Sequence, residues 1–209
     1  MTILGESFDR READCPIAII TPCANGKGFE LDERALKSIL EQPAIADKKI
    51  AVLSIAGAFR KGKSFLLNFI VHYLESLERG NSKKTEEWFS VDTVLDKFHW
   101  RGGTERDTQG IHMWSRPFVI RNDYGEEMVV VLLDSQGAFD SQSTMRDCAT
   151  IFALSTLVSS LQIFNISQNI QECDLNHLRL FTEFAKIAKN GKDDDHSAFQ
   201  ARDSMRNLI

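Results

Sequence analysis

The stretch "IAVLSIAGAFRKGKS", Ile50 to Ser64, decides the fold of this chain. Seven mostly apolar residues, which are typical of a buried strand, run directly into two glycines that bracket a cluster of positive charge. The segment that follows, Lys63 to Leu77, carries apolar residues at helical spacing. Strand, glycine-rich loop and helix therefore come in the order that a phosphate-binding loop of an α/β protein requires.

The loop itself fits the pattern G-x-x-x-x-G-K-[ST] at Gly57, Gly62, Lys63 and Ser64. Its glycines let successive backbone N–H groups point inward, and the following helix directs its positive end to the same place. The lysine adds a mobile charge for the terminal phosphates, and the serine hydroxyl is placed to ligate Mg²⁺. A solvated basic turn is the alternative, and the flanking strand and helix argue against it. The expected nucleotide-binding residues of the loop are Gly57, Ala58, Phe59, Arg60, Lys61, Gly62, Lys63, Ser64 and Phe65.

Further candidates lie in two later segments. Asp134 ends an apolar run and begins "DSQG", and a carboxylate at a strand end beside a phosphate loop holds the metal, often through water. Gly137 offers a backbone N–H to the last phosphate, and Gln136 is a nucleotide-binding candidate beside it. Thr108 lies in a glycine-rich stretch where a loop that orders around nucleotide is expected. Thr104 competes with it as a Mg²⁺ ligand, because spacing alone does not separate the two.

Arg60 admits two interpretations. Its guanidinium either folds back over the phosphates as an arginine finger from the same chain, or it is a solvated side chain. The catalytic candidates are Arg60, Lys63 and Thr108, and the metal-binding candidates are Ser64, Thr108 and Asp134.

Composition favours a globular α/β protein of the cytoplasm. The 209 residues are 43% hydrophobic and 26% charged, and the net charge of -5 argues against a nucleic-acid partner, because phosphate backbones are held by an excess of cations. No apolar run approaches the roughly 20 residues that cross a bilayer, so we expect no direct membrane insertion by this chain. The four cysteines show no CxxC pairing, and we expect reduced thiols.

Apolar runs alternate with helical patterns, which predicts a mostly parallel central sheet flanked by helices. The expected strands are 16–20, 50–56, 111–120, 128–133 and 161–166, the first at an edge and the last buried, and the expected helices are 30–40, 63–77, 144–159 and 174–188. Strands 111–120 and 128–133 are expected to pair around a turn at 122–125. The predicted organisation is an N-terminal extension with the edge strand (1–28), a nucleotide-binding domain (29–189) and a divergent polar tail (190–209).

Five segments together resemble the large GTPase domain of the atlastins, dynamin-related proteins that fuse endoplasmic reticulum tubules, with the guanylate-binding proteins as more distant relatives. They lie between residues 29 and 184 and read "FELDERALKSIL", "SIAGAFRKGKSFLLNF", "FHWRGGTERDTQGIHMWS", "VVVLLDSQGAFDSQST" and "ATIFALSTLVSSLQIFNISQNIQECDLNHLRLFTEF". The resemblance implies a P-loop NTPase fold of the Ras-like large type and Mg²⁺-dependent hydrolysis of GTP, with GTP and GDP as ligands.

The resemblance also assigns roles to single residues. It makes Arg60 the expected arginine finger and adds Arg106 as a residue that helps to fix the first switch loop. The other roles that it implies are phosphate binding by Lys63, Mg²⁺ binding by Ser64 and Thr108, and a second switch formed by Asp134 and Gly137.

In the family, nucleotide-loaded domains pair face to face, and hydrolysis moves a helical bundle that draws two membranes together. The resemblance thus implies homotypic membrane fusion at the cytosolic face of the endoplasmic reticulum, and a nucleotide-dependent homodimer or pairing with full-length relatives. The family reads guanine with an Arg-Asp pair after a further buried strand, but Arg202 and Asp203 follow a segment without strand character. We therefore expect a chain cut before the guanine-reading motif and the membrane segments, with an incomplete sheet and low stability.

Two other functions fit the residues. One is a truncated, non-catalytic module that binds nucleotide or a relative without turnover. The other is a P-loop ATPase or small kinase, although "DSQG" and the stretch around Thr108 suit hydrolysis by a positioned water better than transfer to a second substrate.

Overall fold

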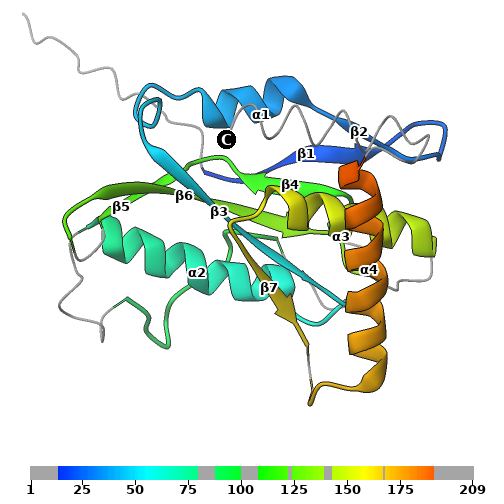
Figure 1. The fold of residues 1–209 in the computed structure, drawn as a ribbon. Helices are drawn as coiled ribbons and strands as arrows, with labels where there is room; N and C mark the ends of the chain where they lie inside the picture. The colour runs from blue at the N-terminus through cyan, green and yellow to red at the C-terminus, as the bar shows by residue number, and fades with distance from the viewer. Residues whose placement is uncertain are drawn as a thin grey trace, which may run out of the picture.

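The phosphate-loop stretch begins as a strand of a seven-stranded sheet in this computed structural model (Figure 1). The structure describes residues 14–79, 88–99, 108–121, 124–138, 143–166 and 168–190. Their strands are β1 (Pro16–Pro22), β2 (Phe29–Leu31), β3 (Lys49–Gly57), β4 (Ile111–Trp114), β5 (Phe118–Arg121), β6 (Glu127–Ser135) and β7 (Leu161–Asn165). Their helices are α1 (Glu33–Leu40), α2 (Lys63–Glu78), α3 (Met145–Val158) and α4 (Glu172–Asn190).

The order of strands across the sheet is β2-β1-β4-β6-β3-β7, and β5 pairs with β6 outside this path. The predicted α/β class with helices around a central sheet is confirmed. The expectation of mostly parallel pairing is wrong for the described strands, since only the two pairs that β3 makes, with β6 and with β7, are parallel. The other four pairs are antiparallel. The physical reason is that short connections, such as the turn from β5 to β6, join antiparallel neighbours, whereas parallel neighbours need a long crossover.

Both edges of the described sheet differ from what the sequence predicted. The strand at 16–20, expected at an edge, is internal, because β1 lies between β2 and β4. Residues 30 and 31, expected to begin a helix, instead belong to the edge strand β2, and α1 starts only after Asp32, whose carboxylate accepts a hydrogen bond from Ala35 N–H at 2.9 Å. At the other edge of the described sheet lies β7, which was expected to be buried but leaves Leu161 58% exposed.

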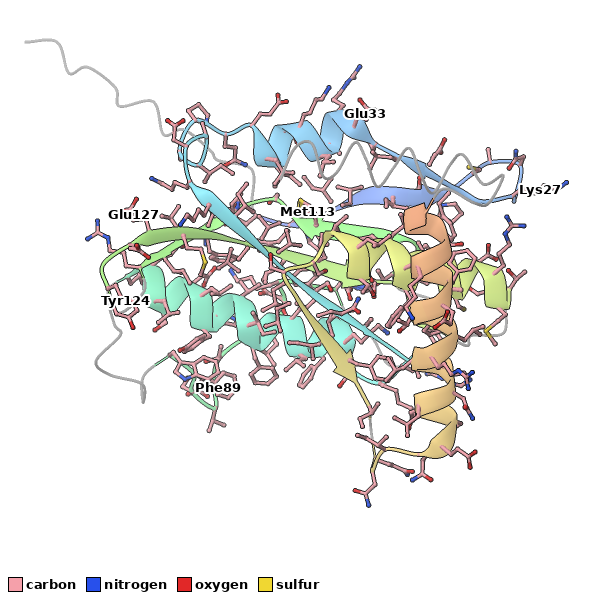
Figure 2. All side chains as sticks on the ribbon, in the orientation of Figure 1. Lys27, Glu33, Phe89, Met113, Tyr124 and Glu127 are labelled. Carbon is pink, nitrogen blue, oxygen red and sulfur yellow. The ribbon has the colours of Figure 1, made fainter. Side chains whose placement is uncertain are left out.

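The predicted strand 111–120 is divided in two. Its parts, β4 and β5, pair with the C-terminal and the N-terminal half of β6. Pro117 stands in the interruption, where its missing N–H makes it unable to continue the ladder. The predicted pairing around the turn at 122–125 is confirmed, and Figure 2 shows Tyr124 and Glu127 at the end of the sheet where this turn lies.

An apolar core lies on each face of the sheet. Along β6, Val129, Val131 and Leu133 belong to the core that packs α1 and α3, whereas Val130 and Leu132 belong to the core that packs α2. This alternation is the period of a strand that is buried on both faces. Burial of each such side chain contributes about 1.5–3 kcal/mol to the free energy of unfolding. Strand β6 is therefore held by apolar packing as far as its C-terminal end.

Helix α2 confirms the predicted helix at 63–77. Some of its large aromatic side chains lie on the exposed face of the helix and not in the core. The outer face carries Phe65 and Tyr73, which are 36% and 41% exposed, and Phe89 packs there against Phe69 with ring centroids 5.0 Å apart (Figure 2). The buried side chains that hold α2 on the sheet are Leu67, Val71 and Leu74.

Helices α3 and α4 confirm the predictions at 144–159 and 174–188. A capping box between Thr144 and Asp147 starts α3 and satisfies two of its first backbone N–H groups. Helix α4 packs on α3 through Phe181, whose ring lies 4.6 Å from that of Phe152. Leu175 is 56% exposed, although its spacing from Leu178 and Phe181 matches the apolar face of a helix. Among the described helices, none is long and apolar enough to cross a bilayer.

Candidate functional site

The loop between β3 and α2 enters the helix through two residues with left-handed backbone. Arg60 has φ 60° and Gly62 has φ 80°. Gly62 is also the N-cap of α2, and among the described residues no side chain caps the start of this helix, whereas Asp32 caps α1 and Thr144 caps α3. The positive end of the α2 dipole therefore lies at the loop, where it attracts an anion.

Two glycines allow the loop to be clamped between neighbouring segments. A Cβ at Gly57 would lie 2.3 Å from the carbonyl oxygen of Asn165 at the end of β7, and one at Gly137 would lie 2.5 Å from Phe59 Cα. Phe59 N–H donates to the Ala138 carbonyl at 2.8 Å, and Ala138 N–H donates to the Gly57 carbonyl at 3.1 Å. The "DSQG" segment thus lies directly against the loop, as the proposed second switch requires.

Three oxygen-bearing side chains from separate segments meet beside the start of α2. Ser64 Oγ donates a hydrogen bond to Asp134 Oδ2 at 2.6 Å, and Thr108 Oγ1 donates to the same oxygen at 2.9 Å. The two hydroxyl oxygens are 3.4 Å apart. The parallel register of β3 and β6 places Ile55 opposite Asp134, and this brings the carboxylate to the beginning of the loop.

Asp134 is almost fully buried, with 2% of the residue exposed. Burial raises the pKa of its carboxyl group, and this effect is opposed by the hydrogen bond from Ser64, the charge of Lys63 and the hydrogen bond from Thr108. Its second oxygen, Oδ1, is buried without a hydrogen-bond partner among the described residues. An unsatisfied buried acceptor of this kind costs about 1–3 kcal/mol, which a bound cation would offset.

This donor set fits Mg²⁺. Two hydroxyls and a carboxylate are hard oxygen ligands, and Mg²⁺ typically takes one or two protein carboxylates and completes its octahedron with waters and substrate phosphates. The orphaned Asp134 Oδ1 supplies an acceptor that the protein itself leaves unused in the described part of the chain. Ser64, Thr108 and Asp134 are thus the residues that would hold the ion.

A family model described as guanylate-binding protein, N-terminal domain, matches residues 26–208. The chain belongs to this family. Within it, the chain is similar to Atlastin-2 of Homo sapiens, with 51% identity over 197 residues that cover 90% of this chain and 33% of the relative. Atlastin-3 of Mus musculus is 50% identical over 174 residues, 83% of this chain and 32% of the relative. Atlastin-1 of Macaca fascicularis is 51% identical over 161 residues, 77% of this chain and 28% of the relative.

The predicted resemblance to an atlastin-like GTPase domain of the guanylate-binding protein family is therefore confirmed. The chain spans about a third of the length of the curated relatives that it matches.

Two basic side chains of the loop, Lys63 and Arg60, differ in their surroundings. Lys63 is 7% exposed, and its Nζ donates to the Ala58 carbonyl at 3.2 Å and lies 3.0 Å from where a Cβ of Gly137 would be. Its charge therefore lies between the loop and the "DSQG" segment. Arg60 is exposed, with its guanidinium carbon 5.8 Å from the centroid of the Phe59 ring.

The other predicted site residues fall into three groups. The Phe65 ring packs on Phe69 outside the loop, with centroids 5.1 Å apart, so its contribution to the loop is a backbone N–H in the first turn of α2. Gln136 is buried with its side chain directed at Gly110 rather than at the loop. Thr104, Arg106, Arg202 and Asp203, and residues 191–209 of the predicted polar tail, lie outside the described residues.

Sequence reasoning missed two asparagines that support the site. Asn68 is fully buried in α2, donates to the carbonyls of Ser64 and Phe98, and accepts from the N–H groups of Lys97 and Phe98. The sequence does contain a signal for Asn68, because a polar residue within the apolar pattern of a helix indicates a buried side chain that needs hydrogen-bond partners. Asn165 at the end of β7 donates through Nδ2 to the Lys61 carbonyl and so holds the loop on its β7 side. No local sequence pattern predicts this contact.

A cleft of about 310 Å³ opens on the β7 side of the loop. Ala58, Lys61 and Asn165 line it together with the connection from β7 to α4. It lies outside the carboxyl ends of the parallel strands, where open α/β sheets bind ligands.

Proposed function

We propose that this chain binds GTP together with Mg²⁺ and hydrolyses it, as the nucleotide-binding part of a dynamin-related GTPase that fuses endoplasmic reticulum membranes. The observation that carries the proposal is the meeting of Ser64, Thr108 and Asp134 beside the start of α2. A metal-binding cluster and an anion-binding helix end at one place suit a nucleoside triphosphate with its metal better than either ligand alone. Similarity to three atlastins supports guanine as the base.

In this proposal, one group of residues binds the phosphates and another binds the metal ion. The loop N–H groups and Lys63 hold the phosphates, and Ser64, Thr108 and Asp134 hold the metal ion. The ion that they would hold would supply positive charge against the negative charge that develops on the phosphate oxygens. Gly137 brings its backbone N–H to the last phosphate, since its segment is hydrogen-bonded to the loop.

Arg60 serves as the arginine finger in this proposal. Its left-handed backbone turns the side chain away from the core and leaves the guanidinium exposed at the rim of the loop. A guanidinium is always charged and offers several donors in a plane, which suits it to neutralise charge on the leaving oxygens.

The cellular role is proposed from the resemblance to atlastins. We expect two nucleotide-loaded copies to pair, or one copy to pair with a longer relative, at the cytosolic face of the endoplasmic reticulum. Light scattering of the purified chain with a non-hydrolysable GTP analogue tests the pairing: a doubling of mass that Mg²⁺ and the analogue induce together supports it, and an unchanged monomer contradicts it.

The experiment that tests the proposed reaction is phosphate release from GTP or ATP with Mg²⁺, compared with Lys63→Ala. Lys48→Ala is the matched control, because Lys48 precedes β3 at the opposite end from the loop and pairs with Glu127. We expect GTP-selective release by the wild type and by Lys48→Ala, and none by Lys63→Ala. Nucleotide binding without release indicates a non-catalytic module, and a preference for ATP contradicts the assignment of guanine.

A further inference from the structure

Two segments of the proposed site are joined by a reciprocal pair of hydrogen bonds at Gln136. Its backbone N–H donates to the Gly110 carbonyl at 2.8 Å, and its side-chain Oε1 accepts from the Gly110 N–H at 3.0 Å. Two residues earlier on each segment, Thr108 donates to Asp134. The segment that carries Thr108 and the segment that carries Asp134 are thus joined at two points.

This fastening extends the β4–β6 ladder beyond its last backbone pair. Ile111 lies opposite Ser135 in the ladder, so Gly110 and Gln136 come next. A backbone carbonyl would normally accept from the Gly110 N–H at this point, and the Gln136 side chain takes its place. Gly110 N–H is buried, and without this acceptor it would lose its partner.

Gly110 can move little from this position. Its φ of 72° is left-handed, and a Cβ there would lie 1.9 Å from the Ile20 carbonyl oxygen in β1. The backbone of Gly110 therefore packs directly on β1, and only a glycine fits. Gly110 is thus held between β1 on one side and Gln136 on the other, which constrains the path of the chain back to Thr108.

The orientation of the Gln136 amide follows from its partners. The Gly110 N–H needs an acceptor, so Oε1 faces it, and Nε2 is left to donate to Ser143 Oγ. Ser143 directly precedes Thr144, the N-cap of α3. The buried Gln136 side chain, 6% exposed, has both ends engaged and is turned toward these supports.

We propose that Gln136 is a positioning residue, which holds Thr108 against Asp134 and thereby sets the affinity of the site for Mg²⁺ without touching the nucleotide. The inference rests on the proposed function, and it replaces the expectation that Gln136 binds the nucleotide. Support of a metal ligand by a neighbouring hydrogen bond typically changes metal affinity 10- to 100-fold.

The experiment measures binding of a fluorescent GTP analogue by the full chain, first in EDTA and then across a Mg²⁺ titration. Gln136→Met keeps the bulk of the side chain and removes both hydrogen bonds. We expect its apparent dissociation constant for Mg²⁺ to rise about tenfold, while its affinity for the analogue in EDTA stays within about twofold of the wild type. Affinity lowered equally with and without Mg²⁺ means direct nucleotide contact and overturns the proposal.

Gln162→Met is the matched control for loss of a structural amide. Gln162 also makes two side-chain hydrogen bonds, to Ser155 and from Thr156, but on the far side of β3 from Asp134. We expect it to leave the Mg²⁺ constant unchanged. If both glutamine variants weaken Mg²⁺ binding alike, a general loss of stability explains the effect and the proposal fails.

A double variant separates positioning from other roles. If Gln136 acts through Thr108, then Thr108→Ala with Gln136→Met has the same Mg²⁺ constant as Thr108→Ala alone. Additive effects overturn the proposal. Gln136→Ala repeats the test should the methionine disturb packing, with circular dichroism to verify folding. Failure of the wild type to bind the analogue overturns the proposed function as well, whereas a normal wild type beside an unchanged Gln136 variant overturns the positioning role alone.

Discussion

Ser64 Oγ and Asp134 Oδ2 are 2.6 Å apart, although the residues are separated by 70 positions in the sequence. The bond joins the first turn of α2 to the last part of β6, and it exists because β3, which leads into the loop, runs parallel to β6. One cation can therefore contact a hydroxyl and a carboxylate that the chain brings from distant segments.

Replacement of Asp134 by asparagine should stabilise the protein in a chelating buffer. It removes a buried charge whose pKa is raised by burial, and we expect a gain of roughly 1 kcal/mol at neutral pH, or about 2–4 °C in melting temperature. Because the folded state holds this proton more tightly than the unfolded state, wild-type stability falls as pH rises from the ordinary value of 3.8 through the raised pKa. The advantage of Asp134→Asn should thus be larger at pH 7 than at pH 4.5.

The same variant should gain nothing from Mg²⁺ and nucleotide, whereas the wild type melts at higher temperature when both are added. Differential scanning fluorimetry at the two pH values, with EDTA or Mg²⁺, measures all of these differences. A variant that melts below the wild type in EDTA at pH 7 would show that the carboxylate stabilises the metal-free fold.

Replacement of Gly137 by alanine should disrupt the loop. The new Cβ would lie 2.5 Å from Phe59 Cα, a backbone atom that has no side-chain freedom to move aside. Overpacking of this kind costs about 1–3 kcal/mol, and we expect at least a tenfold loss of nucleotide affinity. Isothermal titration calorimetry provides the measurement.

Gly125→Ala is the control for this glycine. Gly125 has φ 81° in the β5–β6 turn, and a Cβ there meets nothing within 4 Å. It should cost about 1 kcal/mol of stability through backbone strain and leave nucleotide affinity unchanged. Equal affinity of both variants for nucleotide would contradict the clamping role of Gly137.

Two replacements of Arg60 should separate backbone strain from charge. Arg60→Ala keeps a side chain at φ 60°, whereas Arg60→Gly removes the strain, so we expect the glycine variant to be more stable by roughly 1 kcal/mol. Both lack the guanidinium and should hydrolyse GTP about 10³-fold more slowly. Thermal melts and single-turnover kinetics test the two effects. Hydrolysis at the wild-type rate by either variant would exclude Arg60 as the finger.

Replacement of Asn68 by alanine should strongly destabilise the fold. The buried amide makes four hydrogen bonds, three of which hold residues 97–98 against α2. Their loss leaves buried backbone groups without partners, and we expect a cost of about 3 kcal/mol, or roughly 6–12 °C in melting temperature. Asn25→Ala, which removes an exposed turn bond to Lys27 N–H, should change the melting temperature by less than about 2 °C. A similar small shift for both would contradict the role assigned to Asn68.

Local signals predicted the parts of the site that lie within one segment. The loop from Gly57 to Ser64 and the strand end at Asp134 are readable because each couples an apolar run to particular residue types over a short distance. The bond between Gln136 and Gly110 was not predictable, since it depends on the register of β4 on β6. The same holds for Asn165, whose partner is fixed by the pairing of β7 with β3.

The errors in the fold have equally local causes. Leu31 and Ala35 match a helical period, and the pattern does not reveal that Asp32 between them ends a strand and caps the helix. The faces of α2 were similarly ambiguous, because aromatic residues on its outer side, such as Phe65 and Tyr73, are as apolar as those in the core. Tertiary packing decides such cases, and single-sequence periodicity does not contain it.

The separation in sequence between paired strands should also set the order in which the protein folds. Hairpins such as β1–β2 and β5–β6 join residues that are close in the chain, so their loop-closure entropy is small. The β3–β6 ladder must first bring together residues as distant as Ile55 and Asp134, which makes it a slow, late step. A chain in which only these hairpins have formed would have no affinity for phosphate, and recovery of nucleotide binding during refolding should lag behind the first recovery of β-structure.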